Sequence, residues 1–275
     1  MIIYSRPPYP DIYYPYLILS ATDKSTEKYV RTDWGIRYII IDSGVYRVFH
    51  KDSRTEYPGG YKYWVDKVAS LWVYASKFVK NVYVTIPDYP ADYPHNPVPQ
   101  NIERTIRNIE YALEKYPNVK WLVPIQGLPN SLSSVVRTIR VLKEGGLLKS
   151  DYVAIAPTCV TRNTEFLRRL ALTVRTHLPN YKIHMFGVIK RSWDRIKDYV
   201  FSVDTVTYAF YCSRLFKRKF CLNTKENIIG WLLFLRDLVE GGYVGPEVFG
   251  LSLETAKRKY GIPSNELLRY LEYTF

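Results

Sequence analysis

Apolar runs alternate with amphipathic segments along most of this chain. The runs are short, rich in Ile, Val and Tyr, and several are apolar on both faces, as buried strands are. They lie at Tyr16–Ser20, Tyr38–Ile41, Val82–Ile86, Trp121–Ile125, Tyr152–Ile155, Ile183–Phe186 and Val203–Tyr208. Segments of helical period lie between them, at Tyr61–Phe78, Ile102–Tyr116, Ser131–Lys143, Thr164–His177 and Trp193–Tyr199. This order predicts a parallel sheet with helices outside it.

The number of strands favours a barrel without completing one. These seven runs are one fewer than a closed (β/α)8 barrel needs. The eighth strand either lies in Lys217–Leu222 or is absent, and a doubly wound open sheet is the alternative. Asn101 is placed to cap the helix after it, and Gly145–Gly146 to end the helix that starts at Ser131. We predict an α/β fold, a TIM-like (β/α)8 barrel over residues 1–242 with a short C-terminal helical extension.

Residues 243–275 form a tail with its own pattern. A long helix over Lys225–Glu240 precedes it, and two short helices are predicted inside it. They meet at Tyr260–Gly261–Ile262–Pro263, with Ser264 or Asn265 capping the second, which is helix-turn-helix spacing. DNA binding is one interpretation, and a plain helical hairpin that closes the barrel is the other.

The charge of the chain favours a polyanionic partner. Lys and Arg total 39 against 26 Asp and Glu, which gives a net charge of +13. Nucleic acid is the partner that such an excess favours, and a solvated basic surface is the alternative. The scarcity of Gln beside many charged residues also indicates a thermophile source.

Other compositional signals exclude functions rather than assign them. The three cysteines, Cys159, Cys212 and Cys221, form no CxxC pair, so neither a disulfide framework nor a structural zinc is predicted. The four histidines show no ligand spacing, and we expect no metal and no cofactor. No charge-free apolar stretch reaches the roughly 18 residues of a membrane span. The N-terminus also lacks a signal pattern, so we expect a soluble, cytoplasmic protein without membrane contact.

Four polar residues come just after apolar runs, where a parallel barrel presents its functional groups. The strands of such a barrel are buried, and their C-terminal ends open onto the active face. Taken alone, each of these residues is better explained by a turn or by a satisfied structural role. Four from four different runs indicate a site assembled across the sheet, formed by Asp42, Asp88, Gln126 and Asp204.

The chemistry of these residue types suits a planar heterocycle. A carboxylate such as Asp88 can accept two N–H bonds from a guanine-like edge, and the amide of Gln126 suits the carbonyl side of the same base. Gly44 lets the backbone turn tightly beside Asp42 and approach a ligand. Tyr46 offers a flat face on which a base can stack.

Asp204 stands among β-branched residues in the segment FSVDTVTY. A carboxylate buried there is costly unless it has partners, water or a chemical role. A carboxylate nucleophile is one such role. A structural Asp with satisfied hydrogen bonds is the alternative.

Taken together, these segments resemble the motifs of the tRNA-guanine transglycosylases. That family's DSGGFQVF resembles DSGVYRVF at 42–49, and its FDECTPYPADY with a following ERTLRW helix resembles PDYPADYPHNPVPQNIERTIRNIE at 87–110. Its VQGG, LMGVG and GIDMFDCV resemble the shorter segments at 125–128, 185–188 and 201–206. The motifs keep the family's order over roughly residues 16 to 210. The resemblance includes the branch of relatives that inserts 7-deazaguanine bases into DNA.

The resemblance implies a fold and a reaction. The family's fold is a (β/α)8 barrel, in agreement with the alternation of elements. Asp204 would attack the sugar C1′ and expel guanine, with a covalent intermediate, and Asp42 would be the general acid and base. A 7-deazaguanine base of the preQ0 kind would replace guanine in DNA or tRNA, with DNA slightly favoured. Base binding would fall to Asp88, Gln126, Gly127, Tyr46, Ser43 and Gly44.

The chain also departs from the family pattern. The second glycine of the first motif is Val45, its Gln is Arg47, and Ile155–Val160 has no double glycine. The family's zinc-binding Cys/His cluster is missing. Two competing hypotheses therefore stay open. One is a non-catalytic, basic nucleic-acid-binding protein on a degenerate barrel, and the other is a different barrel enzyme in which Asp42 and Asp204 lie far apart.

Overall fold

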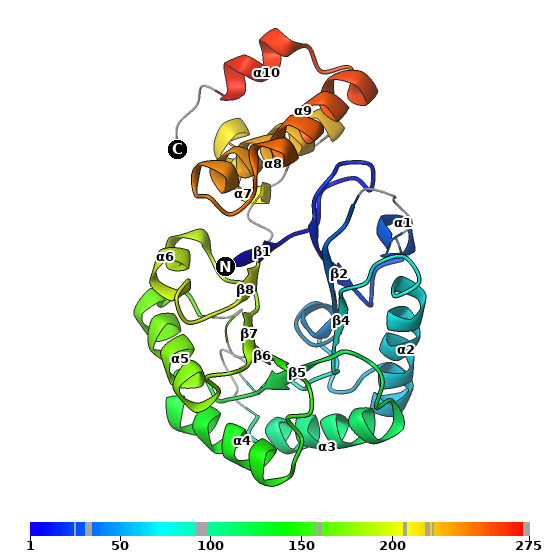
Figure 1. Cartoon of the computed structure of the whole chain (residues 1–275), viewed down its shortest axis with the longest axis vertical. Helices are drawn as coiled ribbons and strands as arrows, with labels where there is room; N and C mark the ends of the chain where they lie inside the picture. Colours follow the sequence, from blue (N-terminus) through cyan, green and yellow to red (C-terminus); the bar gives the residue numbers. More distant parts are fainter. Residues whose placement is uncertain are drawn as a thin grey trace.

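The computed structural model describes residues 1–24, 26–30, 35–91, 98–156, 158, 161–205, 208–217, 221 and 223–271. Within these residues, eight parallel strands form one sheet that is nearly closed into a barrel (Figure 1). The strands are β1 (Ile2–Tyr4), β2 (Tyr16–Ser20), β3 (Tyr38–Asp42), β4 (Val82–Thr85), β5 (Trp121–Ile125), β6 (Tyr152–Ile155), β7 (Lys182–Met185) and β8 (Ser202–Asp204). Neighbours in the sheet are also neighbours in the chain, and β1 pairs with β8. The prediction of a (β/α)8 barrel is confirmed, and the doubly wound alternative is wrong.

The eighth strand is not where the sequence pattern placed it. It is β1, at the N-terminus, and Ser5 just after it joins the ring to β2. The Ser5 N–H donates to the Tyr16 carbonyl at 3.1 Å, and the Ile18 N–H donates to the Ser5 carbonyl at 3.2 Å. The sequence pattern left the eighth strand either in Lys217–Leu222 or absent; residues 218–220 and 222 of that segment lie outside the described residues. A strand of three residues is too short to show a periodicity in the sequence. Only its pairing with β8 identifies β1 as a strand.

Helices surround the barrel as the amphipathic segments predicted (Figure 1). Along the chain, the helices between β2 and β8 are α1 (Thr26–Val30), the π-helix η1 (Tyr46–Lys51), α2 (Gly60–Ala75), α3 (Gln100–Lys115), α4 (Leu132–Glu144), α5 (Thr164–His177), the 3-10 turn η2 (Lys190–Ser192) and α6 (Trp193–Ile196). Helix α4 shows why they form. Ser131 caps it by accepting the Ser134 N–H at 3.2 Å, and Gly146 ends it with a positive φ of 62°.

The barrel interior is aromatic. Residues at alternate strand positions point inward, and they form a cluster separate from the core between strands and helices. Tyrosines supply much of this interior, namely Tyr4, Tyr16, Tyr38, Tyr83 and Tyr152, together with aliphatic residues such as Ile40 and Leu122. Because the period is two, Asp42 lies on the same inner side as Ile40.

Four further helices follow β8: α7 (Tyr208–Phe216), α8 (Thr224–Glu240), α9 (Pro246–Tyr260) and α10 (Ser264–Leu271). They gather beside β1 at one end of the molecule (Figure 1). Trp231 of α8 is fully buried against the Tyr14 ring, with ring centroids 5.3 Å apart. Ser252 of α9 donates to the Tyr13 carbonyl at 3.2 Å. Thus α8, which a boundary at residue 242 assigns to the barrel, contacts both the loop before β2 and the tail helices.

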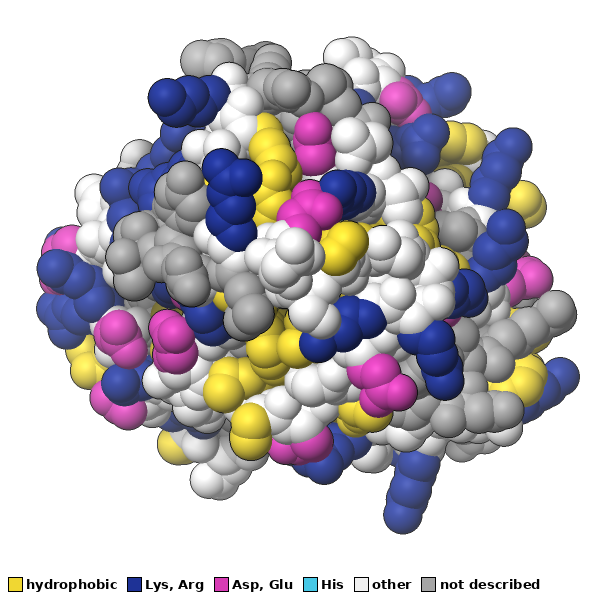
Figure 2. Space-filling model, turned by 90° about the horizontal axis from the view of Figure 1, so that it is seen from above, with side chains coloured by type: hydrophobic (Ala, Val, Ile, Leu, Met, Phe, Trp, Pro, Cys, Tyr) yellow, Lys and Arg dark blue, Asp and Glu magenta, His cyan; other side chains and the backbone are white. Residues whose placement is uncertain are grey.

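The tail contains the two helices predicted for it, joined through Gly261, whose φ is positive at 61°. Seen from the end of the molecule that carries them, Lys and Arg side chains lie on several parts of the surface, with Asp and Glu between them (Figure 2). The helix-turn-helix interpretation stays a prediction.

Cys212 and Cys221 form a disulfide that the cysteine spacing did not predict. It joins α7 to the segment just before α8, with the two Cα atoms 5.4 Å apart. The expectation of no disulfide was wrong because the two cysteines meet only after α7 turns back toward α8. In the described part of the chain, none of the helices combines the length and apolarity that crossing a membrane requires.

Candidate active site at the carboxyl rim of the barrel

Asp42 and Asp204 end two strands on the same rim of the barrel. Asp42 is the last residue of β3, opposite Ser20 of β2, and Asp204 is the last residue of β8, opposite Tyr4 of β1. Parallel strands place all their carboxyl ends on one face. Asp204 lies two residues beyond Ser202, which bonds to groups inside the barrel, so both carboxylates follow inward rows. The predicted convergence of these two residues on one rim agrees with the fold.

The two carboxylates interact electrostatically. Burial, and next the negative charge of Asp204, raise the pKa of Asp42 from 3.8 to about 7. Hydrogen bonds from the backbone N–H groups of Gly44 and Ser43 act in the opposite direction, and the Gly44 N–H lies 3.0 Å from Oδ2. Asp42 can therefore both give and take a proton near neutral pH, as a general acid and base must.

Asp204 is held by one of its two oxygens. Oδ1 accepts the Gly187 backbone N–H at 2.8 Å and faces Nε2 of His184 at 3.2 Å. Its side chain is 15% exposed. Within the described part of the chain no hydrogen bond to Oδ2 is found, so Oδ2 is the oxygen available to react.

Asp88 and Gln126 form a buried pair. Asp88 lies after β4 and is 5% exposed, and Gln126 follows β5 and is 1% exposed. Nε2 of Gln126 donates to Oδ2 of Asp88, and the Ser43 hydroxyl lies 3.5 Å from Oδ1. The amide oxygen of Gln126 has no hydrogen-bond partner among the described residues. A buried acceptor without a donor is costly, so it suits a ligand N–H. We expected this amide to face a base carbonyl, but its donor is already bonded to Asp88.

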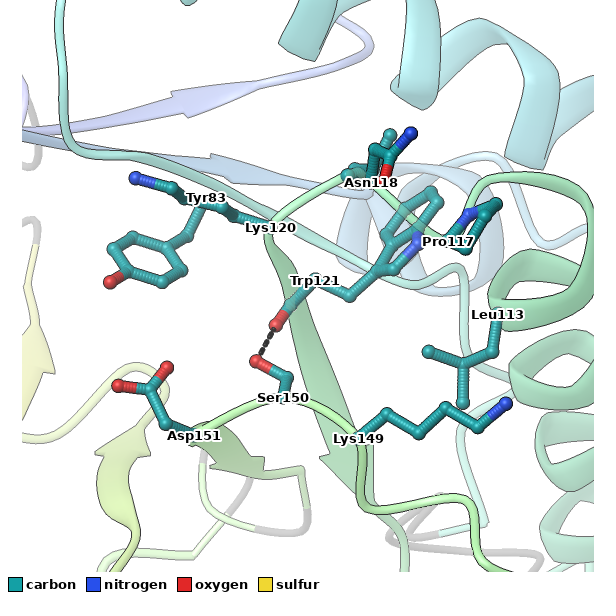
Figure 3. A pocket seen from close by; sticks show the side chains of 10 residues that line it. Tyr83, Leu113, Pro117, Asn118, Lys120, Trp121, Lys149, Ser150 and Asp151 are labelled. Carbon is teal, nitrogen blue, oxygen red and sulfur yellow. Dashed lines mark hydrogen bonds between the residues drawn. The ribbon is translucent and has the colours of Figure 1, made fainter.

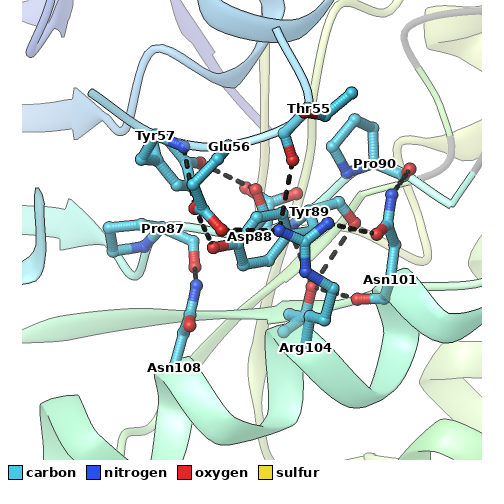
Figure 4. A network of polar contacts seen from close by, with 11 residues as sticks. Thr55, Glu56, Tyr57, Pro87, Asp88, Tyr89, Pro90, Asn101, Arg104 and Asn108 are labelled. Carbon is cyan, nitrogen blue, oxygen red and sulfur yellow. Dashed lines mark hydrogen bonds and ion pairs between the residues drawn. The ribbon is translucent and has the colours of Figure 1, made fainter. Parts of the chain in front are cut away.

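The loop that carries Asp88 is held at each backbone position (Figure 4). Helix α3 presents Asn101, Thr105 and Asn108 along one buried stripe. Their side chains bond to the Pro90 carbonyl at 2.8 Å, the Tyr89 N–H at 2.9 Å and the Pro87 carbonyl at 2.6 Å. The Tyr57 hydroxyl donates to the Asp88 carbonyl at 2.7 Å. Asp88 is thus preorganised by backbone contacts rather than by its own side chain alone.

The role predicted for Asn101 is wrong. Helix α3 starts at Gln100 with Pro99 at its cap position, so Asn101 lies inside the first turn and binds the Asp88 loop instead. The same helix extends this loop contact through Arg104, which bonds to Glu56 at 2.7 Å and lies over the Tyr89 ring at 3.6 Å (Figure 4). Glu56 also accepts from the Tyr89 hydroxyl.

Two predicted site glycines are required by close packing. Gly44 has a φ of 83°, and a Cβ there would lie 2.4 Å from Cγ2 of Thr22. A Cβ on Gly127 would lie 2.4 Å from Cγ2 of Val135 in α4. Both glycines therefore allow the backbone to lie close to a neighbouring segment. Their role in binding a ligand stays a prediction.

Tyr46 lies in η1 and is 53% exposed. Its ring stacks on His50, with centroids 5.2 Å apart. An exposed ring can stack on a planar group, but His50 already covers one face of the Tyr46 ring. The role of Tyr46 in stacking a base stays a prediction. Cys159 and Val160, which the sequence analysis names, lie outside the described residues.

Sequence reasoning missed His184, Ser202 and Tyr152. Nδ1 of His184 lies 2.7 Å from the Ser202 hydroxyl, which in turn bonds to the Tyr152 hydroxyl. All three residues are fully buried. The signal was present, because a lone His inside the apolar strand KIHM must satisfy its ring nitrogens somewhere. The spacing test for metal ligands could not detect that.

One pocket lies at the opposite end of the barrel from this rim. It has a volume of about 510 Å³ and is lined by Tyr83, Lys120, Trp121, Lys149 and Asp151 (Figure 3). Polar groups there satisfy each other, since Ser150 donates to the Trp121 carbonyl at 2.5 Å and Asp151 pairs with Lys182 at 2.7 Å. Because barrel enzymes place catalysis at the carboxyl end of the strands, we assign the site to the rim with Asp42 and Asp204.

Comparison with models of known protein families and with curated proteins finds no match to this sequence. The resemblance to the tRNA-guanine transglycosylases therefore depends on the motifs alone. Among the described residues, no three His, Cys, Asp or Glu side chains are grouped as metal ligands would be.

Proposed function

We propose that this protein is a transglycosylase that exchanges guanine in nucleic acid for a 7-deazaguanine base. One observation carries the proposal, namely that Asp42 and Asp204 end two strands on one rim of the barrel and that the charge of Asp204 raises the pKa of Asp42. The pKa of Asp42 is raised to about 7, while Oδ1 of Asp204 accepts the Gly187 N–H and lies against Nε2 of His184. Two carboxylates in different environments are the requirement for glycosidic exchange, because one attacks and the other transfers a proton.

In the first half of the reaction, Asp204 attacks the sugar C1′ with Oδ2. The bond from C1′ to N9 of guanine breaks, its electron pair stays on the base, and the protonated Asp42 gives its proton to that base. A covalent ester between Asp204 and the sugar remains. In the second half, N9–H of the incoming base loses its proton to the ionised Asp42. N9 then attacks C1′ and releases the Asp204 carboxylate.

Base recognition falls to the buried pair of Asp88 and Gln126. The Asp88 carboxylate can accept the N1–H and 2-amino groups of a guanine-like edge, and the unpaired Gln126 oxygen can accept a further N–H. A site built around buried acceptors rejects bases that lack the matching donors. The target nucleotide must leave its stack to reach this pair.

DNA is the polymer to test before tRNA. The net charge of +13 suits either polyanion. The chain lacks the Cys/His zinc cluster of the tRNA enzymes that it resembles, and its tail has helix-turn-helix spacing. These two departures favour DNA.

The test is to trap the covalent intermediate. Purified protein is mixed with guanine-containing DNA or RNA and separated on a denaturing gel, with Asp204→Asn as the control. A slower-migrating species with the native protein and none with the variant supports the assignment. Equal behaviour of the two proteins means that Asp204 is not the nucleophile.

A second measurement separates this function from nucleic-acid binding without chemistry. Radiolabelled guanine is incubated with the protein and an unlabelled duplex, and incorporation into the polymer is counted. Incorporation removes the non-catalytic hypothesis. Salt-dependent binding without any incorporation or adduct would instead support it.

A further inference from the structure

A buried chain of hydrogen bonds runs from Asp204 into the barrel. Oδ1 of Asp204 faces Nε2 of His184 at 3.2 Å, and Nδ1 of His184 lies 2.7 Å from the Ser202 hydroxyl. The Ser202 hydroxyl bonds to that of Tyr152. The chain thus joins three strands, since His184 is on β7, Ser202 and Asp204 on β8, and Tyr152 on β6.

The imidazole of His184 is enclosed by aromatic rings. Its ring centroid lies 5.8 Å from that of Tyr4, 6.4 Å from that of Tyr152 and 4.6 Å from that of Phe186, all in edge-to-face orientation. The ring is fully buried. Among the described residues, Asp204 is the only charged side chain bonded to it. Rotation of the ring would break both of its hydrogen bonds at once, so its orientation is fixed by packing.

The direction of donation along the chain follows from which groups keep their protons. Burial raises the pKa of Tyr4 and that of Tyr152 well above the ordinary phenol range, so both hydroxyls stay protonated and need acceptors. If Tyr152 donates to Ser202, then Ser202 donates to Nδ1 of His184 and Nε2–H donates to Asp204. In this order the protons of Tyr152, Ser202 and His184 each have an acceptor.

The opposite order creates a conflict at Asp204. Nε2 of His184 would present a lone pair to the carboxylate of Asp204, which also carries lone pairs.

We propose that His184 is the positioning residue of Asp204, held by Ser202 and Tyr152 as the tautomer with its proton on Nε2. This inference rests on the proposed function for its consequence, because it explains which Asp204 oxygen attacks. The Nε2–H and the Gly187 N–H both bind Oδ1 and thereby turn Oδ2 toward the substrate. A hydrogen-bonded orienting group of this kind acts on the geometry and charge of its neighbour rather than on the substrate.

A measurement independent of activity tests the tautomer. The full chain is labelled with 15N-histidine, and the ring nitrogens are observed by long-range 1H–15N correlation. His184→Gln identifies the His184 signals among the four histidines. We expect Nε2 to show the shift of a protonated nitrogen and Nδ1 that of an unprotonated acceptor. A proton on Nδ1, with Nε2 bare, overturns the proposal.

The same experiment on two variants tests the hydrogen bonds that link Tyr152 to His184 through Ser202. Tyr152→Phe removes the donor to Ser202. Tyr83→Phe is the matched control, because it makes the same change in a barrel tyrosine that takes no part in these hydrogen bonds. We expect Tyr152→Phe to shift the Nδ1 signal of His184 and Tyr83→Phe to leave it in place. Equal shifts in the two variants overturn the role of Tyr152.

Adduct formation tests the positioning role. His184→Ala is expected to slow formation of the Asp204 adduct by about 10- to 100-fold, because the nucleophile loses its orientation. His184→Gln should recover most of that rate, since the Gln amide can place an N–H near the position of Nε2. A wild-type rate in His184→Ala overturns the proposal, as does a folded His184→Gln variant as slow as His184→Ala. If the native protein forms no adduct, the proposed function fails while the tautomer result still decides the structural assignment.

Discussion

Asp42 on β3 and Asp204 on β8 face the barrel axis from one rim, and the charge of Asp204 changes the pKa of Asp42. Burial and then this charge raise the pKa of Asp42 to about 7. Two carboxylates that share a site cannot both ionise freely, and the protein separates their roles through their surroundings. Oδ1 of Asp204 accepts the Gly187 N–H and lies against Nε2 of His184, whereas Asp42 accepts the backbone N–H of Gly44.

The pH dependence of the two half-reactions should have opposite signs. Adduct formation needs protonated Asp42, so its second-order rate constant should fall as pH rises through about 7. Return of a base from the trapped adduct needs ionised Asp42, so that rate should fall as pH drops below the same region. Quenched-flow analysis of adduct formation and decay between pH 5 and pH 9 measures both. Identical profiles for the two steps would contradict the assignment of Asp42.

Asp42 should also limit stability above neutral pH. Its pKa is higher in the folded state than the 3.8 of an exposed carboxyl, so the folded state binds the extra proton. The stabilisation associated with protonated Asp42 is complete below 3.8 and is lost as pH rises to about 7. Asp42→Asn removes this titration and should raise the free energy of unfolding by roughly 1–3 kcal/mol at pH 8, and by less at pH 5.

Urea unfolding at the two pH values measures this difference. The matched control is Asp194→Asn, whose side chain is 83% exposed. That variant should change the unfolding free energy by less than about 0.5 kcal/mol at either pH. A difference between Asp42→Asn and the native protein that does not grow with pH would show that Asp42 is not the titrating group.

The affinity for free guanine shows at which end of the barrel a base binds. If the base lies against Asp88 and Gln126, then Asp88→Asn should weaken binding of free guanine at least about 10-fold, since a buried acceptor is replaced by a donor. Asp151→Asn makes the same change in the pocket at the opposite end and should leave the affinity unchanged. Isothermal titration calorimetry measures both variants. The reverse outcome would place the ligand in the pocket of Figure 3.

The barrel could be predicted from the sequence because its strands and helices have clear periods. The five predicted outer helices correspond to α2–α6, and α5 has the predicted bounds of Thr164–His177. The missing strand β1 could not be predicted, because three residues carry no measurable alternation. Its identity depends on pairing with β8, 200 residues away in the chain.

The candidate site could be predicted only where its residues end strands. Asp42 and Asp204 are strand ends, and a strand end can be recognised locally. His184 could not be assigned, since its partners Ser202 and Tyr152 come from other strands and only the closed barrel brings them together. The role of Asn101 in holding the Asp88 loop could not be predicted for a related reason. Asn101 fits a helix cap by local rules, and only the tertiary contact with Pro90 reveals its other role.

Gly127 should be sensitive to the smallest side chain. A Cβ there would lie 2.4 Å from Cγ2 of Val135, so Gly127→Ala should destabilise the fold by about 1–3 kcal/mol through overpacking. The control is Gly250→Ala in α9, where a Cβ would meet nothing within 4 Å. That change should stabilise by about 0.5–1 kcal/mol, because Ala is favoured over Gly in helices.

A double variant shows whether the clash is the cause. Val135→Ala removes the methyl group that the new Cβ would meet, so Gly127→Ala combined with Val135→Ala should lose less stability than the sum of the single variants. The expected coupling exceeds about 0.5 kcal/mol in thermal or urea unfolding. Strict additivity would mean that Gly127 is required for another reason. Because Gln126 precedes Gly127, the single variant should also weaken guanine binding, and the double variant should recover part of it.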